Sequence, residues 1–462
     1  MLCSSMAMFS ACASVVAGDL RRAGHVITSR SRPSHALRSA PYMSELVDKL
    51  LAAATAIHQQ ECHNGWLNFV PESNAEHEPR NFQDADFISY SVGPDSFAGP
   101  DARSLRDASL IHITREPLLS GGEINALVSE AGAAIEAGAR SNFTYTRQNN
   151  LGEVHVAHLP VARAWLARKL EDTILPLLAS RYGVDRTTLR VFDSLIIQYN
   201  ASQGGVRQPV HRDGSLLSVN IALSRSLDYT GGGTFFEGLH ADSQHEDAAP
   251  SAVLSLEQGH AMCHASGVRH AGHRITSGER WVLVIFLISE RNVQAARRVA
   301  ELAWEAQAKG ELEWSATLFN ACLEMEDNDY ELYYGMASTL AMMGHAKDAR
   351  ALLLLATQRY ACSPKVQVAL GSLLLKARRP RAALRRFERT LELASDADDE
   401  EAKEASMYAG LCGVRLAQAQ PAYSSAFLPQ AKRRLTQALE VADASKRHAV
   451  EGLLMQANAL SR

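Results

Sequence analysis

Two short motifs in the middle of the chain contain residue types that bind transition metals. The first is His211-Arg-Asp213, and the second is His270, which stands ten residues before Arg280. Positions i and i+2 of a strand point to the same face, so a strand here would set an imidazole beside a carboxylate. Two histidines and one carboxylate can occupy one face of an octahedral iron and leave three positions open for a chelating cosubstrate and O2. The pattern therefore predicts a mononuclear iron site.

Arg280 indicates which cosubstrate would fill the open positions. 2-Oxoglutarate chelates a metal through its keto and C1-carboxylate oxygens, so its distal carboxylate needs a fixed cationic partner. A guanidinium offers that carboxylate two parallel charge-assisted hydrogen bonds. Because Arg280 begins an apolar run that extends to Ile288, we expect it at the start of a strand, facing the same interior as His270.

Neighbouring residues leave alternatives open. His264 and His273 flank His270, and either one is an alternative distal ligand. Their sequence context favours His264 as a strand residue that packs near the site and His273 as a turn residue. His211 and Asp213 could also form a surface pair on a loop.

The elements expected around these motifs are short strands. They cover Ser109–Thr114, Val191–Tyr199, Leu216–Ser224, Thr234–Phe236, Ala252–Leu256 and Trp281–Ile288. Glycine-rich turns such as Gly231–Gly233 separate them, which is typical of a double-sheet jelly roll, or double-stranded β-helix. Two helices are expected ahead of the sheet. One begins at the capping box Ser120-Gly-Gly-Glu123, and the other begins at Pro160 and is kinked or ended by Pro176.

Residues 291–462 are expected to be helical and repetitive. Gly310 and Gly344 are 34 residues apart. Three columns of residues recur with the same spacing: Ala303, Ala337 and Gly371; Ser315, Ala349 and Ala383; Phe319, Leu353 and Phe387. Thirty-four residues is the length of a tetratricopeptide repeat, a stacked pair of helices. The alternative is a helical bundle in which the spacing matches by chance.

Composition sets the remaining boundaries. Residues 1–43 form a leader with five arginines and one acidic residue, and residues 44–108 are expected to form a helix and a polar linker. The leader resembles an organelle transit peptide, and the alternatives are a weak secretory segment or a disordered tail. Localisation therefore stays open between plastid, mitochondrion, secretory pathway and cytoplasm. The jelly-roll domain is expected over residues 109–290.

Other features exclude several classes of protein. The net charge of −4 and the lack of an aromatic and basic patch argue against a nucleic-acid partner. The seven cysteines include no C-x-x-C pair, which argues against a disulfide scaffold and a cysteine zinc site. No uninterrupted apolar run reaches about 18 residues, so no membrane-spanning segment is expected.

Together the motifs resemble the prolyl 4-hydroxylase/lysyl hydroxylase superfamily of Fe(II)- and 2-oxoglutarate-dependent dioxygenases over about residues 110–290. The matching motifs are His211-Arg-Asp213, Gly232-Gly-Thr-Phe-Phe236, Gly259-His-Ala-Met-Cys-His264 and the segment His270–Arg280. The segments Ser218–Ser224 and His270–Arg280 are closest to the lysyl hydroxylase branch. Collagen prolyl hydroxylases usually carry lysine at the position of Arg280, so the chain departs from them there.

The resemblance implies a role for each site residue. The implied iron ligands are His211, Asp213 and His270. Arg280 would anchor 2-oxoglutarate, and Tyr199 would line the cosubstrate pocket, although the loop Asn200–Val210 departs from the family's pattern. The implied reaction hydroxylates a C–H bond of a prolyl or lysyl residue in a protein, gives succinate and CO2, and uses ascorbate as a further cofactor.

The helical repeats bear on the substrate. Stacked helix pairs form a concave surface that suits extended peptides, so they are expected to bind a protein or peptide substrate. Two other functions stay open. One is a repeat-based binding or scaffold protein with an inactive jelly roll, which the complete ligand set argues against. The other is a dioxygenase that acts on a small molecule.

Overall fold

The chain folds into two compact units in a computed structural model. The structure describes residues 41–68, 79–92, 109–139, 150–240, 253–326, 329–360, 363–394, 400–442 and 444–461. The sheet unit comprises the described residues of Asp48–Ala295, and the helical unit those of Thr28–Val47 and Ala296–Arg462. Residues 1–40 of the expected leader lie outside the described residues. Among the described residues, no helix is long and apolar enough to cross a membrane.

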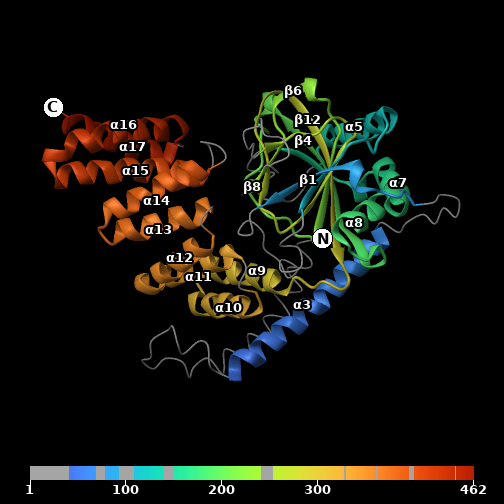
Figure 1. The fold of residues 1–462 in the computed structure, drawn as a ribbon, viewed down its shortest axis with the longest axis horizontal. Coiled ribbons are helices and arrows are strands. Elements are labelled where there is room, and N and C mark those ends of the chain that lie inside the picture. Colours follow the sequence, from blue (N-terminus) through green and yellow to red (C-terminus); the bar gives the residue numbers. More distant parts are fainter. Residues whose placement is uncertain are drawn as a thin grey trace. The chain divides into compact units, whose positions relative to one another are not determined.

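The sheet unit contains two antiparallel sheets (Figure 1). The larger sheet follows the order β3 (Gly152–His155), β4 (Leu189–Asn200), β12 (Ile275–Ser289), β5 (Leu217–Ala222), β10 (Ala261–Ala265), β2 (Ile111–Thr114), β1 (Phe87–Val92) and β8 (Leu239–His240), with β6 (Tyr229–Gly231) also paired to β12. The smaller sheet follows the order β11 (His270–Gly272), β7 (Thr234–Phe236) and β9 (Val253–Leu254). An antiparallel sheet core followed by an all-helical region is the order expected from the sequence. The jelly-roll topology itself stays a prediction.

The two longest strands, β4 and β12, pair along most of their length. Their register sets Tyr199 opposite Arg280 at one end and Arg190 opposite Ile288 at the other. Both strands carry long apolar runs because both faces of the sheet are covered at their centre. This pairing fixes the position of Arg280 relative to the rest of the sheet.

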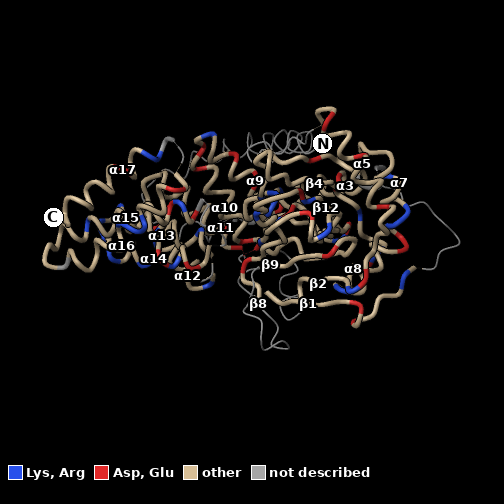
Figure 2. Tube along the Cα trace, turned by 90° about the horizontal axis from the view of Figure 1, so that it is seen from above, with Lys and Arg blue, Asp and Glu red and all other residues tan. Residues whose placement is uncertain are grey.

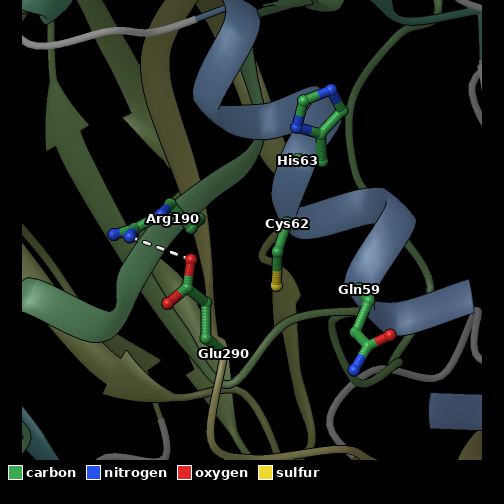
Figure 3. Close-up of a pocket in the computed structure, with 5 residues that line it drawn as sticks. All are labelled: Gln59, Cys62, His63, Arg190 and Glu290. Atoms are coloured by element: carbon green, nitrogen blue, oxygen red, sulfur yellow. Dashed lines mark ion pairs between the residues drawn. The ribbon is translucent and has the colours of Figure 1, made fainter. Parts of the chain in front are cut away.

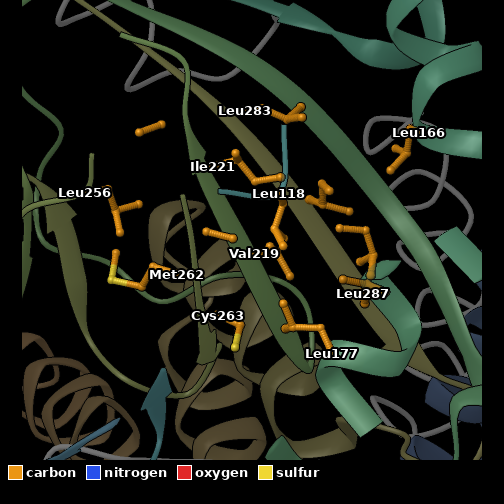
Figure 4. Packing of buried hydrophobic residues seen from close by; sticks show 14 of the residues in the cluster. Leu118, Leu166, Leu177, Val219, Ile221, Leu256, Met262, Cys263, Leu283 and Leu287 are labelled. Carbon is orange, nitrogen blue, oxygen red and sulfur yellow. The ribbon is translucent and has the colours of Figure 1, made fainter. Parts of the chain in front are cut away.

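Helices α5 (Gly121–Glu136), α7 (Pro160–Lys169) and α8 (Leu175–Tyr182) lie beside the larger sheet (Figure 1). Figure 4 shows the hydrophobic core between them, where Leu166 and Leu177 of the helices belong to the same buried cluster as Val219 and Leu283 of the strands. Burying such a side chain stabilises the fold by about 1.5–3 kcal/mol. The two expected helices ahead of the sheet are thus present, the second of them in two segments.

The expected helix signals at Ser120 and Pro176 act in different ways. Ser120 and Glu123 form the predicted capping box, in which the Ser120 backbone N–H donates to the Glu123 carboxylate at 2.8 Å. Pro176 does not end the helical stretch, because a π-helical turn over Leu170–Ile174 precedes α8. Pro176 has no backbone N–H to donate to the carbonyl of Asp172. That carbonyl instead accepts the backbone N–H of Arg80 at 2.8 Å.

Two expectations ahead of the sheet need correction. The sequence predicts the first helix over residues 44–60, and the structure has a longer one, α3 (Pro41–Asn68). The expected polar linker contains strand β1, whose Tyr90 pairs with Ile111 of β2. Four of the six residues of Phe87–Val92 are apolar, but polar segments lie on both sides of them, so the composition of the whole region suggested a loop. The described part of the 44–108 region therefore contributes an element of the sheet.

The helical unit consists of antiparallel helix pairs (Figure 1). Its helices are α9 (Ala295–Ala308), α10 (Leu312–Met325), α11 (Tyr330–Met342), α12 (Ala346–Arg359), α13 (Pro364–Lys376), α14 (Pro380–Leu393), α15 (Glu400–Ala419), α16 (Ser424–Val441) and α17 (Ala444–Ala459). Basic and acidic residues are interspersed along these helices (Figure 2). Each repeat can bury its apolar face only against its neighbours, as in other stacked helical arrays.

The predicted 34-residue period is visible in the backbone. Gly310 and Gly344 both have positive φ angles, of 77° and 87°, in the turns between paired helices. Arg378 occupies the next equivalent position with a φ of 54°, so the third turn keeps its conformation without glycine. The small residues Ser315, Ala349 and Ala383 are fully buried, as expected where two helices cross.

Candidate functional site

The two expected histidine ligands meet in a backbone bridge. His211 lies opposite His270, the first residue of β11, and each backbone N–H donates to the other's carbonyl, at 2.8 and 2.9 Å. Their rings are consequently close, with centroids 4.7 Å apart. Residues 212 and 213 have no regular secondary structure. Of the strand expected over 211–213, only the bridge at His211 is present.

Three ligand atoms converge at this point. One atom each from His211, Asp213 and His270 lies within 4.8 Å of the other two. His211 Nε2 is 3.3 Å from Asp213 Oδ1, and His270 Nε2 is 3.5 Å from Asp213 Oδ2. This arrangement suits one metal ion held by two imidazoles and a carboxylate.

Backbone carbonyls orient both imidazole rings. His211 Nδ1 donates to the carbonyl of Pro209 at 2.8 Å, and His270 Nδ1 donates to the carbonyl of Val268 at 3.0 Å. Because a carbonyl can only accept, each Nδ1 carries a proton, and each neutral ring then turns the lone pair of its Nε2 toward Asp213. A fixed tautomer of this kind is typical of metal-binding histidines.

Two of the three residues have the charge state that a metal requires. Burial by itself would raise the pKa of Asp213, but the imidazoles of His270 and His211 hold it well below its usual range. Burial lowers the pKa of His270 to about 3, so this ring is neutral at neutral pH. Burial also lowers the pKa of His211, but the hydrogen bond that its ring donates to Asp213, the negative charge of that carboxylate and the Pro209 carbonyl together leave the pKa raised. Metal binding at His211 would therefore compete with a proton.

A hydrogen-bonded chain of three serine hydroxyls ends at Asp213. The Ser218 hydroxyl donates to Asp213 Oδ2 at 2.5 Å. Ser266 lies 2.9 Å from Ser218 and 2.8 Å from Ser215, so three buried hydroxyls join in one chain. The sequence showed Ser218 only as a strand position, and no motif signals a hydroxyl that reaches back to a residue five positions earlier.

Tyr199 and Arg280 form the expected cosubstrate end of the site. The Arg280 guanidinium lies over the Tyr199 ring, with Cζ 5.0 Å from the ring centroid. Both side chains are buried, and within the described part of the chain Arg280 Nη1 has no hydrogen-bond partner. A buried donor without a partner destabilises the protein unless a ligand accepts from it. A carboxylate would meet that need, so the residues present fit 2-oxoglutarate.

Gly272 connects the two parts of the site. It stands two residues after His270, and a Cβ atom placed on it would clash with the Tyr199 hydroxyl and lie 2.7 Å from Tyr199 Cζ. Only glycine leaves room for the ring here. Burial raises the pKa of Tyr199 to about 12, so its hydroxyl stays protonated and can donate.

The alternative histidines occupy different positions. His264 on β10 is fully buried, its ring centroid is 4.4 Å from that of His270, and its Nε2 is 3.9 Å from Asp213 Oδ2. It packs beside the three-residue group without being part of it. His273 follows β11, and its backbone N–H donates to the carbonyl of Gly233 at 3.0 Å. It too is absent from that group among the described residues.

A buried ion pair adjoins the site and was not expected from the sequence. Arg269 Nε lies 3.2 Å from Glu237 Oε2, and each side chain is only 6% exposed. Arg269 directly precedes β11 and Glu237 directly follows β7, the strand with which β11 pairs, and the Glu237 backbone N–H donates to the Arg269 carbonyl at 2.9 Å. No spacing rule links them, because they become neighbours only through strand pairing.

A cavity of about 470 Å³ lies elsewhere in the sheet unit. It is lined by Gln59, Cys62, His63, Arg190 and Glu290, and Figure 3 shows the ion pair between the last two, at 2.9 Å. Arg190 is nine residues from Tyr199 along β4, which is roughly 30 Å of strand. The cavity is therefore separate from the histidine and aspartate cluster.

Sequence comparison finds relatives among oxygenases. No protein-family model matches the chain. The chain is 32% identical over 123 residues to the mouse 2-oxoglutarate and iron-dependent oxygenase domain-containing protein 2, which covers 25% of the chain and 32% of the mouse protein. It is 27% identical over 210 residues to the human protein of the same name, which covers 43% of the chain and 55% of the human protein. The chain thus spans about a third to about half of these relatives.

Structural comparison finds partial similarities to two kinds of protein. One is SnoK, a non-haem α-ketoglutarate-dependent carbocyclase, with 16% identity, a TM-score of 0.31, and coverage of 43% of this chain and 87% of SnoK. Another is the tetratricopeptide repeat protein YrrB, with 19% identity, a TM-score of 0.27, and coverage of 35% of this chain and 80% of YrrB. These scores are too low to assign a fold, which rests on the strand order and helix pairs described above.

The relatives agree with the resemblance that the motifs indicated. The motifs indicate iron and 2-oxoglutarate, and both curated relatives are named for those two requirements. In sequence, the chain is therefore a relative of the 2-oxoglutarate and iron-dependent oxygenase domain-containing proteins.

Proposed function

We propose that the chain is an Fe(II)- and 2-oxoglutarate-dependent dioxygenase that hydroxylates a C–H bond of a prolyl or lysyl residue in a protein. The observation that carries the proposal is the meeting of His211, Asp213 and His270 within 4.8 Å, in a fold that also buries Arg280 with an Nη1 that has no partner among the residues that the structure describes. The first three residues would hold iron. Arg280 would bind the distal carboxylate of 2-oxoglutarate.

The chain's own residues would bind and orient the reactants. The bound iron supplies the activation of O2 that the side chains cannot provide. The His211 and His270 rings are set by the Pro209 and Val268 carbonyls, so their Nε2 atoms need no reorientation to bind a metal. Arg280 would fix the cosubstrate through a charge-assisted bidentate contact.

Apolar packing would keep water away from the site. Phe236 is fully buried, and its ring centroid lies 5.3 Å from that of His264 and 5.8 Å from that of His270. Excluding water strengthens the electrostatic interactions inside a site and limits side reactions of reactive intermediates. Phe236 is thus suited to shield the side of the cluster that faces the smaller sheet.

The helical unit supports a protein substrate over a small molecule. Its stacked helices would bind an extended peptide and deliver one residue to the site. The complete cluster argues against a scaffold protein with an inactive sheet unit. The resemblance to lysyl hydroxylases favours lysyl or prolyl side chains as targets.

The decisive experiment is mass spectrometry of a peptide library incubated with the full chain, Fe(II), 2-oxoglutarate, ascorbate and O2. The expected result is one added oxygen on lysyl or prolyl residues, with stoichiometric succinate, and no addition with Asp213→Ala. Oxygen addition only to a small-molecule panel would support the small-molecule alternative. Absence of succinate with every substrate, together with absence of Fe(II) binding, would support the scaffold alternative.

A further inference from the structure

We propose that the helical unit carries a binding site for a lysine side chain of a partner peptide, formed by Tyr334 of α11 and by Glu401 and Glu404 of α15. The inference deepens the proposed function by naming the class of peptide that the helices bind, a lysine-rich one. It rests on the proposed function where it makes this peptide the substrate.

The helices that carry these residues lie on the inner side of the stack. α13 contacts both α11 and α15, whereas α12 and α14, the second helices of their pairs, make no comparable contact with each other over their described residues. A stack whose first helices lie closer together than its second helices curves toward the first ones. Tyr334, Glu401 and Glu404 therefore belong to the concave side, which suits an extended peptide.

An aromatic surface extends over two of the inner helices. Trp304 of α9 lies beside Tyr334, with ring centroids 5.9 Å apart, and both side chains are partly exposed. The chain's own Lys365 shows how an ammonium binds here. Its Nζ lies 5.0 Å from the Tyr334 ring centroid and 3.5 Å from Glu331 Oε1. An ammonium is attracted by the face of an aromatic ring as well as by a carboxylate, so the two together favour lysine.

Carboxylates from α15 act on the same tyrosine. Glu404 Oε1 accepts the Ser372 hydroxyl of α13 at 3.4 Å, which holds this carboxylate toward the helix between α11 and α15. Burial raises the pKa of Tyr334, and the negative charges of Glu404, Glu401 and Glu331 raise it further. Three negative charges thus converge on one half-buried phenol, and their field attracts a cation. A lysine can pack its apolar stem on the aromatic rings while its ammonium reaches the carboxylates.

The test measures binding of fluorescein-labelled hexalysine to the full chain by fluorescence anisotropy, without Fe(II) or 2-oxoglutarate. Acetylated hexalysine, which has the same length without the side-chain charges, is the reference peptide and should bind at least about tenfold more weakly. The double variant Glu401→Gln with Glu404→Gln should weaken hexalysine binding about tenfold, because it removes two charge partners of the ammonium groups. Tyr334→Leu should weaken it about threefold, because leucine is apolar but has no aromatic face.

The matched control is the double variant Glu313→Gln with Glu392→Gln, which makes the same change in net charge at exposed positions of the second helices α10 and α14. It should bind hexalysine as the wild type does. Helical circular dichroism confirms folding, and the glutamine variants keep the side-chain shape if Tyr334→Leu does not fold. Wild-type affinity in either folded test variant, or an equal loss in the control, would overturn the inference. A chain that binds hexalysine through this site but makes no succinate with any peptide would refute the proposed function and leave the binding site standing.

Discussion

The Tyr199 hydroxyl occupies the space into which a side chain on Gly272 would project. Tyr199 lies on β4 opposite Arg280, and Gly272 closes the short strand that begins at His270. The contact therefore joins the proposed cosubstrate end of the site to the proposed metal end. A change at Gly272 should consequently alter 2-oxoglutarate binding without removing any ligand.

We predict that Gly272→Ala raises the KM for 2-oxoglutarate, because the added methyl group must displace the Tyr199 ring and, with it, the Arg280 guanidinium stacked on that ring. Overpacking of this kind destabilises a buried site by about 1–3 kcal/mol. The measurement is the KM from succinate production, beside the affinity for Co(II). The double variant Gly272→Ala with Tyr199→Leu removes the clashing ring and should recover stability. An unaltered KM in the single variant would contradict the proposed link.

Arg280→Ala should raise the KM for 2-oxoglutarate while metal affinity stays nearly unchanged. Loss of one partner of a buried charged pair is worth about 2–5 kcal/mol, which corresponds to roughly 30-fold or more in KM. Arg280→Lys keeps the charge but not the bidentate geometry, so its effect should be smaller. Equal KM values for all three proteins would argue that the cosubstrate is anchored elsewhere.

The ligand assignment can be checked at His270 and His264. His270→Ala should abolish Fe(II) binding, because two ligands cannot form the facial site. His264→Ala should weaken binding by no more than about tenfold, since the ring only packs beside the ligands. Equilibrium titration with Co(II), with circular dichroism to confirm folding, distinguishes the two. The reverse order of affinities would show that His264 is the true distal ligand.

The sequence predicted which residues come together at the site better than it predicted the residues and strands around them. The convergence of His211, Asp213 and His270 could be predicted because metal binding demands particular residue types, and two of them are only two positions apart; their role as iron ligands stays a prediction. The 34-residue helical period and the strand around Tyr199 could also be predicted from the sequence, because each shows a repeating local pattern. Ser266 and Glu237 could not be found, because their roles depend on strand pairing between distant segments. β1 was missed because its six residues stand alone within a long polar region, although Ile88, Tyr90 and Val92 alternate with serines.

A pH prediction follows from His112, which lies on β2 in the larger sheet. Burial lowers its pKa to about 4, and its Nδ1 is within 2.8 Å of the Ser89 hydroxyl. Above pH 6.5 the ring is neutral whether the chain is folded or unfolded, so it has no pH-dependent effect. As pH falls from 6.5 to 4, the unfolded state takes up a proton that the folded state refuses, and stability declines. The full effect is on the order of 3 kcal/mol.

The measurement is urea unfolding at pH 7.5, 5.5 and 4.5 for the wild type and His112→Phe. Phenylalanine suits the aromatic surroundings, since His112 already makes edge contacts with Phe87 and Tyr182. Other titrating groups act equally on both proteins and cancel in the difference. We expect the free energy of unfolding of His112→Phe to rise relative to that of the wild type as pH falls. A difference between the two proteins that stays constant across this range would show that His112 does not cause the pH dependence.

The helical unit provides a test in which the chain supplies its own compensating residue. Gly371 lies where the preceding repeats have Ala303 and Ala337, and a Cβ atom there would lie 2.7 Å from Phe387 Cε1. Phe387 is fully buried, so its ring has little room to move. Gly371→Ala should therefore overpack the helix crossing and lower the free energy of unfolding by about 1–3 kcal/mol.

The preceding repeat pairs alanine with leucine, at Ala337 and Leu353. The double variant Gly371→Ala with Phe387→Leu reproduces that pair and should recover stability beyond the sum of the single changes, by about 0.5–3 kcal/mol. Gly452→Ala is the matched control, because Gly452 is also helical but has open space around its Cα, and alanine there should stabilise the helix by about 0.5–1 kcal/mol. Chemical unfolding followed by helical circular dichroism measures all four variants. Strictly additive effects at Gly371 and Phe387 would mean that the two residues do not form the crossing that the 34-residue period predicts.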